Sequence, residues 1–148
     1  MRVTQVSAFL ENRPGRLLRL LNVLGEAGVN VLAHDIVDAS DFGIVHLIVD
    51  DHRRAVEALS AAGITCTTTT VLATVVPDAP GAFVQWVLRP LAEAGVNIQY
   101  SYAFGALASA QPSEQGQGAR PKVVLKVDDM DRAEEALRAA SSGDSQRG

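Results

Sequence analysis

The hydrophobic and polar positions at the start of the chain predict a strand followed by a helix. Residues 3–10 mix Val, Thr, Ser and Phe as a half-buried strand does, with Val6, Ala8 and Leu10 on one side. Pro14 then stands at the first position of the expected helix, where proline is accepted. Leucines at three- and four-residue spacing give this helix a single apolar stripe: Leu17, Leu20, Leu21 and Leu24. We expect the helix to end at Gly28.

The next segments predict a hairpin, a second helix and a short strand. The β-branched runs at 29–37 and 43–49 are joined by a short polar connection, which favours antiparallel pairing. A second amphipathic helix follows Asp51, and 64–68 reads as a final strand. The order βαββαβ, with one apolar stripe per helix, predicts an α+β fold of the ferredoxin-like type, with both helices on one face of an antiparallel sheet.

The second half of the chain repeats these signals. Asn12-Arg-Pro-Gly15 and Glu26-Ala-Gly-Val-Asn30 return as Asp78-Ala-Pro-Gly81 and Glu93-Ala-Gly-Val-Asn97. Such a repeat indicates two copies of one supersecondary unit. We assign 1–68 to the first unit and 69–140 to the second, and we expect 141–148 to form a disordered tail.

The second copy departs from the first in three places. Pro90 removes a backbone donor inside the predicted helix, so we expect a kink or a broken final turn there. Residues 105–121 are rich in Ala, Ser, Gln and Gly, which is typical of a mobile loop inserted in the hairpin. No apolar residue follows Ala140, so the fourth strand of the second unit is missing. Its sheet either stays three-stranded or borrows an edge strand from elsewhere.

Composition and charge narrow the classes of function. A net charge of −4 and a pI of about 5.3, without a basic stripe, argue against a nucleic-acid surface. Cys66 is the only cysteine, which excludes an internal disulfide and a CxxC metal knuckle. No stretch reaches the roughly 18 apolar residues of a membrane span, and residues 1–10 lack a secretion signal. We therefore expect a cytoplasmic protein that binds no membrane.

The turn into the first helix is the best candidate for binding chemistry. The first N–H groups of a helix have no internal partner and carry partial positive charge, so a carboxylate is favoured there. The amide of Asn12 can accept from an ammonium group or donate to a carboxylate. Should a second unit pack its edge nearby, Asn30 or Asn97 of that unit would meet Asn12 across the seam, an arrangement that suits a zwitterionic amino acid.

Taken together, Glu11-Asn-Arg-Pro-Gly15, the leucine-rich helix and Glu26-Ala-Gly-Val-Asn30 resemble the ACT domain, a small-molecule-sensing module of enzymes of amino-acid metabolism. They are similar in particular to the serine-sensing regulatory domain of phosphoglycerate dehydrogenase. The resemblance extends over residues 1–140 approximately. It implies a βαββαβ fold, association of units in pairs, and amino-acid binding at their interface beside the first helix.

The resemblance also implies the ligand-binding residues. The two ligand-contacting asparagines of the family correspond to Asn12 and Asn30, and in the second copy to Asp78 and Asn97. The rest of the expected binding set is formed by the two proline–glycine turns: Arg13, Pro14, Gly15, Pro80 and Gly81.

Two substitutions qualify the expected sites. Leu10 stands where the dehydrogenase-type site has a histidine, so serine specificity does not follow. Asp78 would attract an ammonium group and repel a carboxylate, so the two sites should differ in affinity or only one should bind. A purely structural role is the alternative. Pro14 and Gly15 would then only start a helix, and the two asparagines would only shape a turn.

Other chemistry finds little support in the sequence. The spacing of His34, Asp35, His46 and His52 matches no zinc motif, and we expect Asp35 and His46 to pair across two strands on an exposed face. No nucleophile elbow or phosphate loop is present. We expect no catalytic residue, metal or cofactor. Phe83 and Trp86 fit either a second packing surface or a partner contact.

The expected function is that of a stand-alone tandem ACT protein. It would bind a small amino acid at the interface between ACT units, act as a regulatory sensor and form a homodimer. The first alternative is a regulatory subunit that docks on a separate amino-acid biosynthetic enzyme, as the ACT-containing small subunit of acetolactate synthase does. The second is an interaction module without a ligand.

Overall fold

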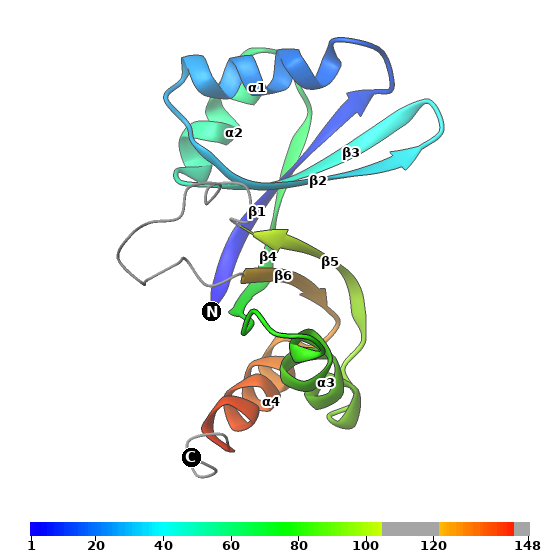
Figure 1. The fold of residues 1–148 in the computed structure, drawn as a ribbon. Helices are drawn as coiled ribbons and strands as arrows, with labels where there is room; N and C mark the ends of the chain where they lie inside the picture. The colour runs from blue at the N-terminus through cyan, green and yellow to red at the C-terminus, as the bar shows by residue number, and fades with distance from the viewer. Residues whose placement is uncertain (105–121, 144–148) are drawn as a thin grey trace. The chain divides into compact units, whose positions relative to one another are not determined.

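The computed structural model describes residues 1–104 and 122–143, which form two compact units (Figure 1). Val3–Thr70 make the first unit, and Met1–Arg2 together with the chain from Val71 make the second. The predicted insertion at 105–121 and the end of the predicted tail, 144–148, lie outside the described residues.

Two strands are shared between the units. Hydrogen bonds join the strands in the order β2-β3-β1-β4-β6-β5. Strand β1 (Arg2–Glu11) begins in the second unit and ends in the first, whereas β4 (Cys66–Val75) begins in the first and ends in the second. The β1–β3, β2–β3, β4–β6 and β5–β6 pairs are antiparallel. The predicted fold class, two ferredoxin-like units, is confirmed, although the strand predicted at 64–68 is longer than expected.

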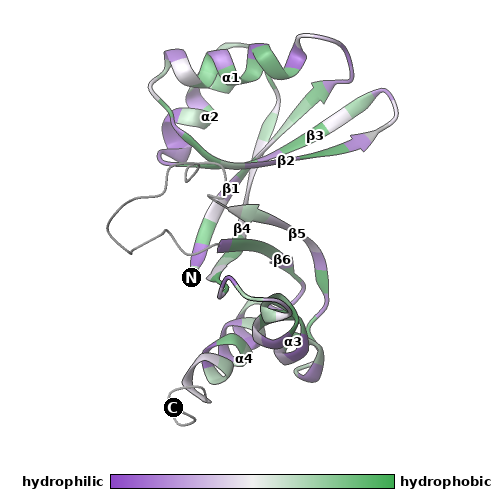
Figure 2. Ribbon diagram, in the orientation of Figure 1, coloured by the Kyte–Doolittle hydropathy of each residue, from purple (hydrophilic) through white to green (hydrophobic). Residues whose placement is uncertain are grey.

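The first unit packs two helices on the sheet portion formed by β1, β2 (Val31–Ala39), β3 (Phe42–Val49) and the start of β4. Helix α1 (Arg16–Glu26) alternates hydrophobic and hydrophilic positions along its length (Figure 2). Helix α2 (His52–Ala61) begins at Asp51, whose side chain caps the helix by accepting from the backbone N–H of Arg54. Buried apolar residues of the helix layer, the sheet layer and their connections form the core: Val6, Ala8, Leu20, Leu24, Val29, Val45, Leu47, Val49, Ala55, Leu59 and Ile64.

The second unit repeats this packing with β5 (Ile98–Phe104), β6 (Lys122–Val127) and the end of β4. Its core is lined by equivalent apolar residues: Leu72, Val76, Ala82, Val87, Leu91, Val96, Leu125, Val127 and Ala133. Phe83 and Trp86 pack against this same core, so they do not form the second packing surface that the sequence suggests.

Pro90 changes the hydrogen bonding of the second unit's first helix. The residues before it form a π-helical turn, η1 (Val84–Leu88), after which α3 (Arg89–Glu93) continues. The N–H of Arg89 bonds to the carbonyl of Val84, five residues back. Because Pro90 has no N–H to donate, the regular ladder cannot continue through it. The predicted irregularity is therefore present, but it precedes the proline and leaves the final turn intact.

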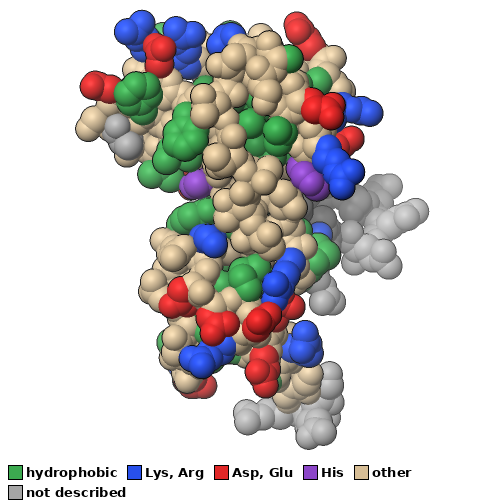
Figure 3. Space-filling model, turned by 180° about the vertical axis from the view of Figure 1, so that it is seen from behind, with side chains coloured by type: hydrophobic (Ala, Val, Ile, Leu, Met, Phe, Trp, Pro, Cys, Tyr) green, Lys and Arg blue, Asp and Glu red, His purple; other side chains and the backbone are tan. Residues whose placement is uncertain are grey.

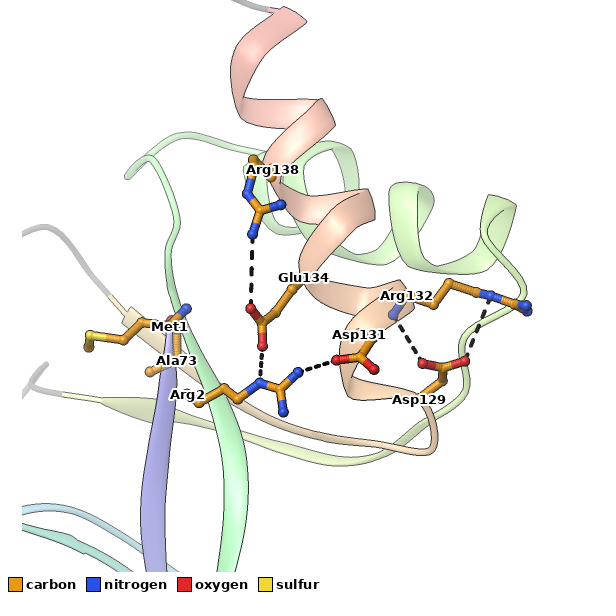
Figure 4. Close-up of polar contacts among 8 residues, drawn as sticks. All are labelled: Met1, Arg2, Ala73, Asp129, Asp131, Arg132, Glu134 and Arg138. Carbon is orange, nitrogen blue, oxygen red and sulfur yellow. Dashed lines mark hydrogen bonds and ion pairs between the residues drawn. The ribbon is translucent and has the colours of Figure 1, made fainter.

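The chain's first residues pair with β4 at the edge where the sequence predicts that the second unit lacks a fourth strand. Met1 donates its α-amino group to the carbonyl of Ala73 at 3.2 Å, and Ala73 returns its N–H to Met1 at 2.8 Å. Arg2 forms ion pairs with Asp131 and Glu134 on α4 (Met130–Gly143), as Figure 4 shows, and these contacts raise the pKa of its guanidinium. No strand follows α4 in the described residues, and the helix includes residues 141–143, which the sequence assigns to the tail.

The described surface carries mixed charge. Acidic and basic side chains are interspersed on the face drawn in Figure 3, without a broad patch of one sign. Within the described ranges, none of the helices is long and apolar enough to span a membrane.

Candidate functional site

The corner between β1 and α1 exposes the start of a helix that has no side-chain cap. Gly15 is the residue before the first helical position, and its φ of 85° is a left-handed conformation that glycine adopts without strain. Its carbonyl accepts from the N–H of Arg19 at 3.0 Å, which starts the helix. The N–H of Arg16 donates to the carbonyl of Arg13 at 3.3 Å. Glycine has no side-chain oxygen, so no side chain caps the first turn, and an anion is favoured there.

Asn12 connects this corner to the β2–β3 turn and the end of β2 through hydrogen bonds. Its backbone N–H donates to the carbonyl of Asp41 at 3.0 Å. Its side-chain Nδ2 donates to Asp38 Oδ1 at 3.3 Å and to the carbonyl of Ser40 at 3.2 Å. Among the described residues, no group donates to Oδ1 of Asn12. The amide therefore holds the hairpin with its nitrogen and keeps its oxygen as a free acceptor.

A groove of about 480 Å³ lies between the corner and the hairpin turn. Arg13 Nε and Arg16 Nη2 each lie 3.4 Å from Oε2 of Glu11, so two guanidinium groups share one carboxylate. Asp41 contributes a carboxylate from the opposite segment. The lining consists of seven residues: Glu11, Asn12, Arg13, Arg16, Ser40, Asp41 and Phe42. The corner side of the groove is therefore net positive and the hairpin side net negative.

This separation of charge is suited to a small zwitterion. Guanidinium groups bind carboxylates through paired, charge-assisted hydrogen bonds. A carboxylate such as that of Asp41 accepts from an ammonium group. Of the predicted binding residues, Asn12 and Arg13 line the groove, while Pro14 and Gly15 shape its corner. The sequence did not predict the other five lining residues: Glu11, Arg16, Ser40, Asp41 and Phe42. The available signal was the charged cluster of Glu11, Arg13 and Arg16 around the Pro-Gly turn.

Asn30 is not brought to this groove within the unit. It lies at the opposite end of α1, where its backbone N–H donates to Asp50 Oδ1 at 2.9 Å and its carbonyl accepts from the N–H of Asp50 at 3.1 Å. Asn97 makes the same pair of bonds with Asp128, at 3.0 Å and 3.2 Å. Both asparagines thus close a turn with their backbones, as the structural alternative predicts, and both remain exposed.

The second corner has the same backbone but different side chains. Gly81 has a φ of 76°, and its carbonyl accepts from the N–H of Gln85 at 3.1 Å, as Gly15 does with Arg19. Pro80 precedes Gly81 as Pro14 precedes Gly15. However, alanines replace both groove arginines, and the exposed Asp78 replaces Asn12. Since Pro77 stands at the position of Glu11, the equivalent positions of the second corner keep one carboxylate, that of Asp78, and neither guanidinium group.

Comparison with protein families settles the membership of the chain. The model of the ACT domain pair matches residues 1–140. The chain belongs to the ACT domain pair family. No curated protein matches it.

Solved structures show the same ACT-pair fold. Protein BT0572 from Bacteroides thetaiotaomicron is similar over 95% of this chain and 90% of its own, with 32% identity and a TM-score of 0.81. The regulatory subunit of aspartate kinase from Thermus thermophilus, in a ligand-free form, is similar over 96% of this chain and 94% of its own, with 18% identity and a TM-score of 0.64. The corresponding subunit from Thermus flavus has 17% identity and a TM-score of 0.61.

The ACT pair also contains a polar cluster that the sequence did not reveal. Asp35 and His46 are paired across β2 and β3 as predicted, but His46 is only 8% exposed, so the predicted exposed face is wrong. Nδ1 of His46 lies 3.0 Å from both Gln5 Nε2 and Ser7 Oγ. Burial lowers the pKa of His46, while the charge of Asp35 acts in the opposite direction. No cluster of metal-ligating side chains occurs in the part of the chain that the structure describes.

Proposed function

We propose that this ACT pair is a non-catalytic regulatory protein that binds a free amino acid in the groove beside Asn12. The supporting observation is the division of charge between the two segments that line the groove. Arg13 and Arg16 come from the β1–α1 corner, and Asp41 comes from the β2–β3 turn. A molecule with a carboxylate and an ammonium group matches both sides at once.

Each end of the ligand has a defined set of partners in this proposal. The ligand carboxylate lies near the guanidinium groups of Arg13 and Arg16 and the uncapped N–H groups of α1. The ligand ammonium group donates to Asp41 and to Oδ1 of Asn12. Glu11 keeps the two guanidinium groups at the corner while the site is empty.

A homodimer would complete the site. Among the described strands, β2 pairs only with β3, and Leu32 and Ile36 on it are exposed. Antiparallel pairing of β2 with β2 of a second copy would cover this edge. Since Asn30 directly precedes β2 and Ser40 directly follows it, that pairing would place Asn30 of the second copy beside Ser40 and Asn12.

A regulatory subunit that docks on a separate biosynthetic enzyme is the second candidate. The supporting observation is that the fold of this chain matches the Thermus thermophilus regulatory subunit over nearly all of both chains. In that case an enzyme would copurify with the chain, and amino-acid affinity would matter less. An interaction module without a ligand is the outcome if neither an amino acid nor an enzyme binds.

A thermal-shift screen against the twenty amino acids tests the proposal. A ligand at 100 times its Kd adds about 2.7 kcal/mol to the free energy of unfolding, or roughly 5 to 11 °C in Tm for a chain of this size. No shift with any amino acid would contradict the proposed function.

Two variants show whether the shift comes from the groove. The double variant Arg13→Ala, Arg16→Ala should abolish it, because both guanidinium partners of the ligand carboxylate are lost. Arg53→Ala is the matched control, since Arg53 is an exposed arginine on α2 of the same unit and does not line the groove. It should keep the full shift.

A further inference from the structure

The groove beside Asn12 has one large apolar side chain in its lining, that of Phe42. Phe42 is 58% exposed and does not belong to the core of the first unit. Aromatic side chains of this size are normally buried, because their apolar area contributes strongly to burial energy. Phe42 is paired with Glu11 across β3 and β1, so both side chains stand on the same face of the sheet. The Phe42 ring therefore lies in the groove on the same face of the sheet as the carboxylate of Glu11.

Building on the proposed function, we infer that Phe42 selects the ligand, which is an α-amino acid with a bulky apolar side chain. The charged groups of the groove hold the carboxylate and ammonium ends, so the ligand side chain is left to meet the remaining lining residue. A leucine or phenylalanine side chain covers the ring and removes apolar area of both partners from water. A serine or alanine side chain is too short to cover it.

The size and charge of the groove agree with this class of ligand. Its volume of about 480 Å³ falls within the range of roughly 300–1,000 Å³ that is usual for small-molecule sites. A charged ligand side chain would lie near residues of its own sign in this groove: Asp41 and Glu11 for an acidic side chain, Arg13 and Arg16 for a basic one. An apolar side chain meets neither penalty.

Isothermal titration of the full chain with leucine, phenylalanine, alanine and serine tests the inference. We expect leucine or phenylalanine to bind at least about tenfold more tightly than alanine and serine, the discrimination that a few apolar carbon atoms provide. Phe42→Ala should remove most of this difference by weakening the bulky ligands, and should leave the affinity for alanine within about twofold.

Phe9→Ala provides the matched control. Phe9 is 43% exposed on the same face of the sheet, where it is paired with Ile44, but it does not line the groove. This variant should keep the preference for bulky ligands. The inference is overturned if the wild type binds serine as tightly as leucine, or if Phe42→Ala weakens self-association in sedimentation without changing selectivity. Either result leaves the proposed function standing. Failure of all four amino acids to bind also overturns the inference, whereas the proposed function is contradicted only if none of the twenty amino acids gives a thermal shift.

Discussion

The two asparagine turns of this ACT pair are built alike, whereas its two proline–glycine corners are not. At each asparagine turn a backbone N–H donates to an aspartate side chain, at 2.9 Å for Asn30 and 3.0 Å for Asn97. The next aspartate in each copy caps the following helix, with both bonds at 3.0 Å. The corners share a backbone conformation, but only the first carries guanidinium groups.

This difference separates what the fold requires from what remains for function. Features present in both copies, such as the left-handed glycines and the aspartate turns, each satisfy backbone groups or allow a tight corner. Features present in only one copy, such as the arginines of the first corner, are not required for the fold that both copies share. The buried Gln5, Ser7 and His46 belong to this second class, since the positions equivalent in strand register are apolar: Val71, Ala73 and Val124.

The largest expected effect tests whether the two cores are equivalent. Leu24 and Leu91 occupy the same place in their helices, and both are fully buried. Leu24→Ala and Leu91→Ala should each lower the free energy of unfolding by about 2–5 kcal/mol, through lost transfer energy and a residual cavity. Urea denaturation measures both. A loss below about 1 kcal/mol in one copy would show that its core does not support the fold as the other does.

The glycines of the two corners should come next. Gly15→Ala and Gly81→Ala place a side chain at a left-handed φ, which costs roughly 1–2 kcal/mol in each copy although nothing crowds the added atom. Gly25→Ala, in open space within α1, is the control and should stabilise the chain by up to about 1 kcal/mol. Equal behaviour of Gly15→Ala and Gly25→Ala would contradict the assignment.

The aspartate turns predict a smaller effect that is again equal in the two copies. Asp50→Ala and Asp128→Ala each remove the side-chain acceptor of an asparagine N–H, at a cost of about 0.5–1.5 kcal/mol. Hydrogen exchange of the Asn30 backbone N–H should accelerate only in Asp50→Ala, and that of the Asn97 backbone N–H only in Asp128→Ala. Unchanged protection of both amides would show that water replaces the carboxylate without loss.

The buried histidine predicts a difference in pH dependence between the copies. Because burial lowers the folded-state pKa of His46 below its ordinary value of 6.5, the unfolded chain binds more protons near that pH. Stability should therefore be complete above pH 6.5 and fall as the pH decreases below it. Tm measured between about pH 7.5 and pH 5.5 detects this. The triple variant Gln5→Val, Ser7→Ala, His46→Val copies the second unit and should lose the part of the pH dependence of Tm that His46 contributes. If Tm falls with pH as steeply in this variant as in the wild type, other groups cause the pH dependence.

The sequence predicts the repeated elements well because their signals are local. The leucine stripe of α1 and the proline-glycine corners depend only on neighbouring residues. The pairing of the chain's first residues with β4 could not be predicted in this way, because Met1 pairs with Ala73, a partner 72 residues away. The exposed face assigned to His46 was wrong for a related reason, since alternation along a strand does not show which face is covered.

The candidate site was predicted only in part. Asn12 and Arg13 were found because they belong to a recognisable motif, whereas Arg16 looked like an ordinary solvent-facing residue of a helix. Asp41 and Phe42 lay in what the sequence shows only as a polar connection. Their contribution depends on how the β2–β3 turn meets the β1–α1 corner, which is a property of the folded unit.

Titration calorimetry of a bulky apolar amino acid against three forms of the chain tests the central claim most directly. If the first corner is the binding site, the wild type binds one ligand per chain, Asn12→Ala loses binding, and Asp78→Ala, the equivalent change in the second corner, keeps it. Binding that survives Asn12→Ala and disappears with Asp78→Ala, or a wild type with two equal sites per chain, would contradict the account.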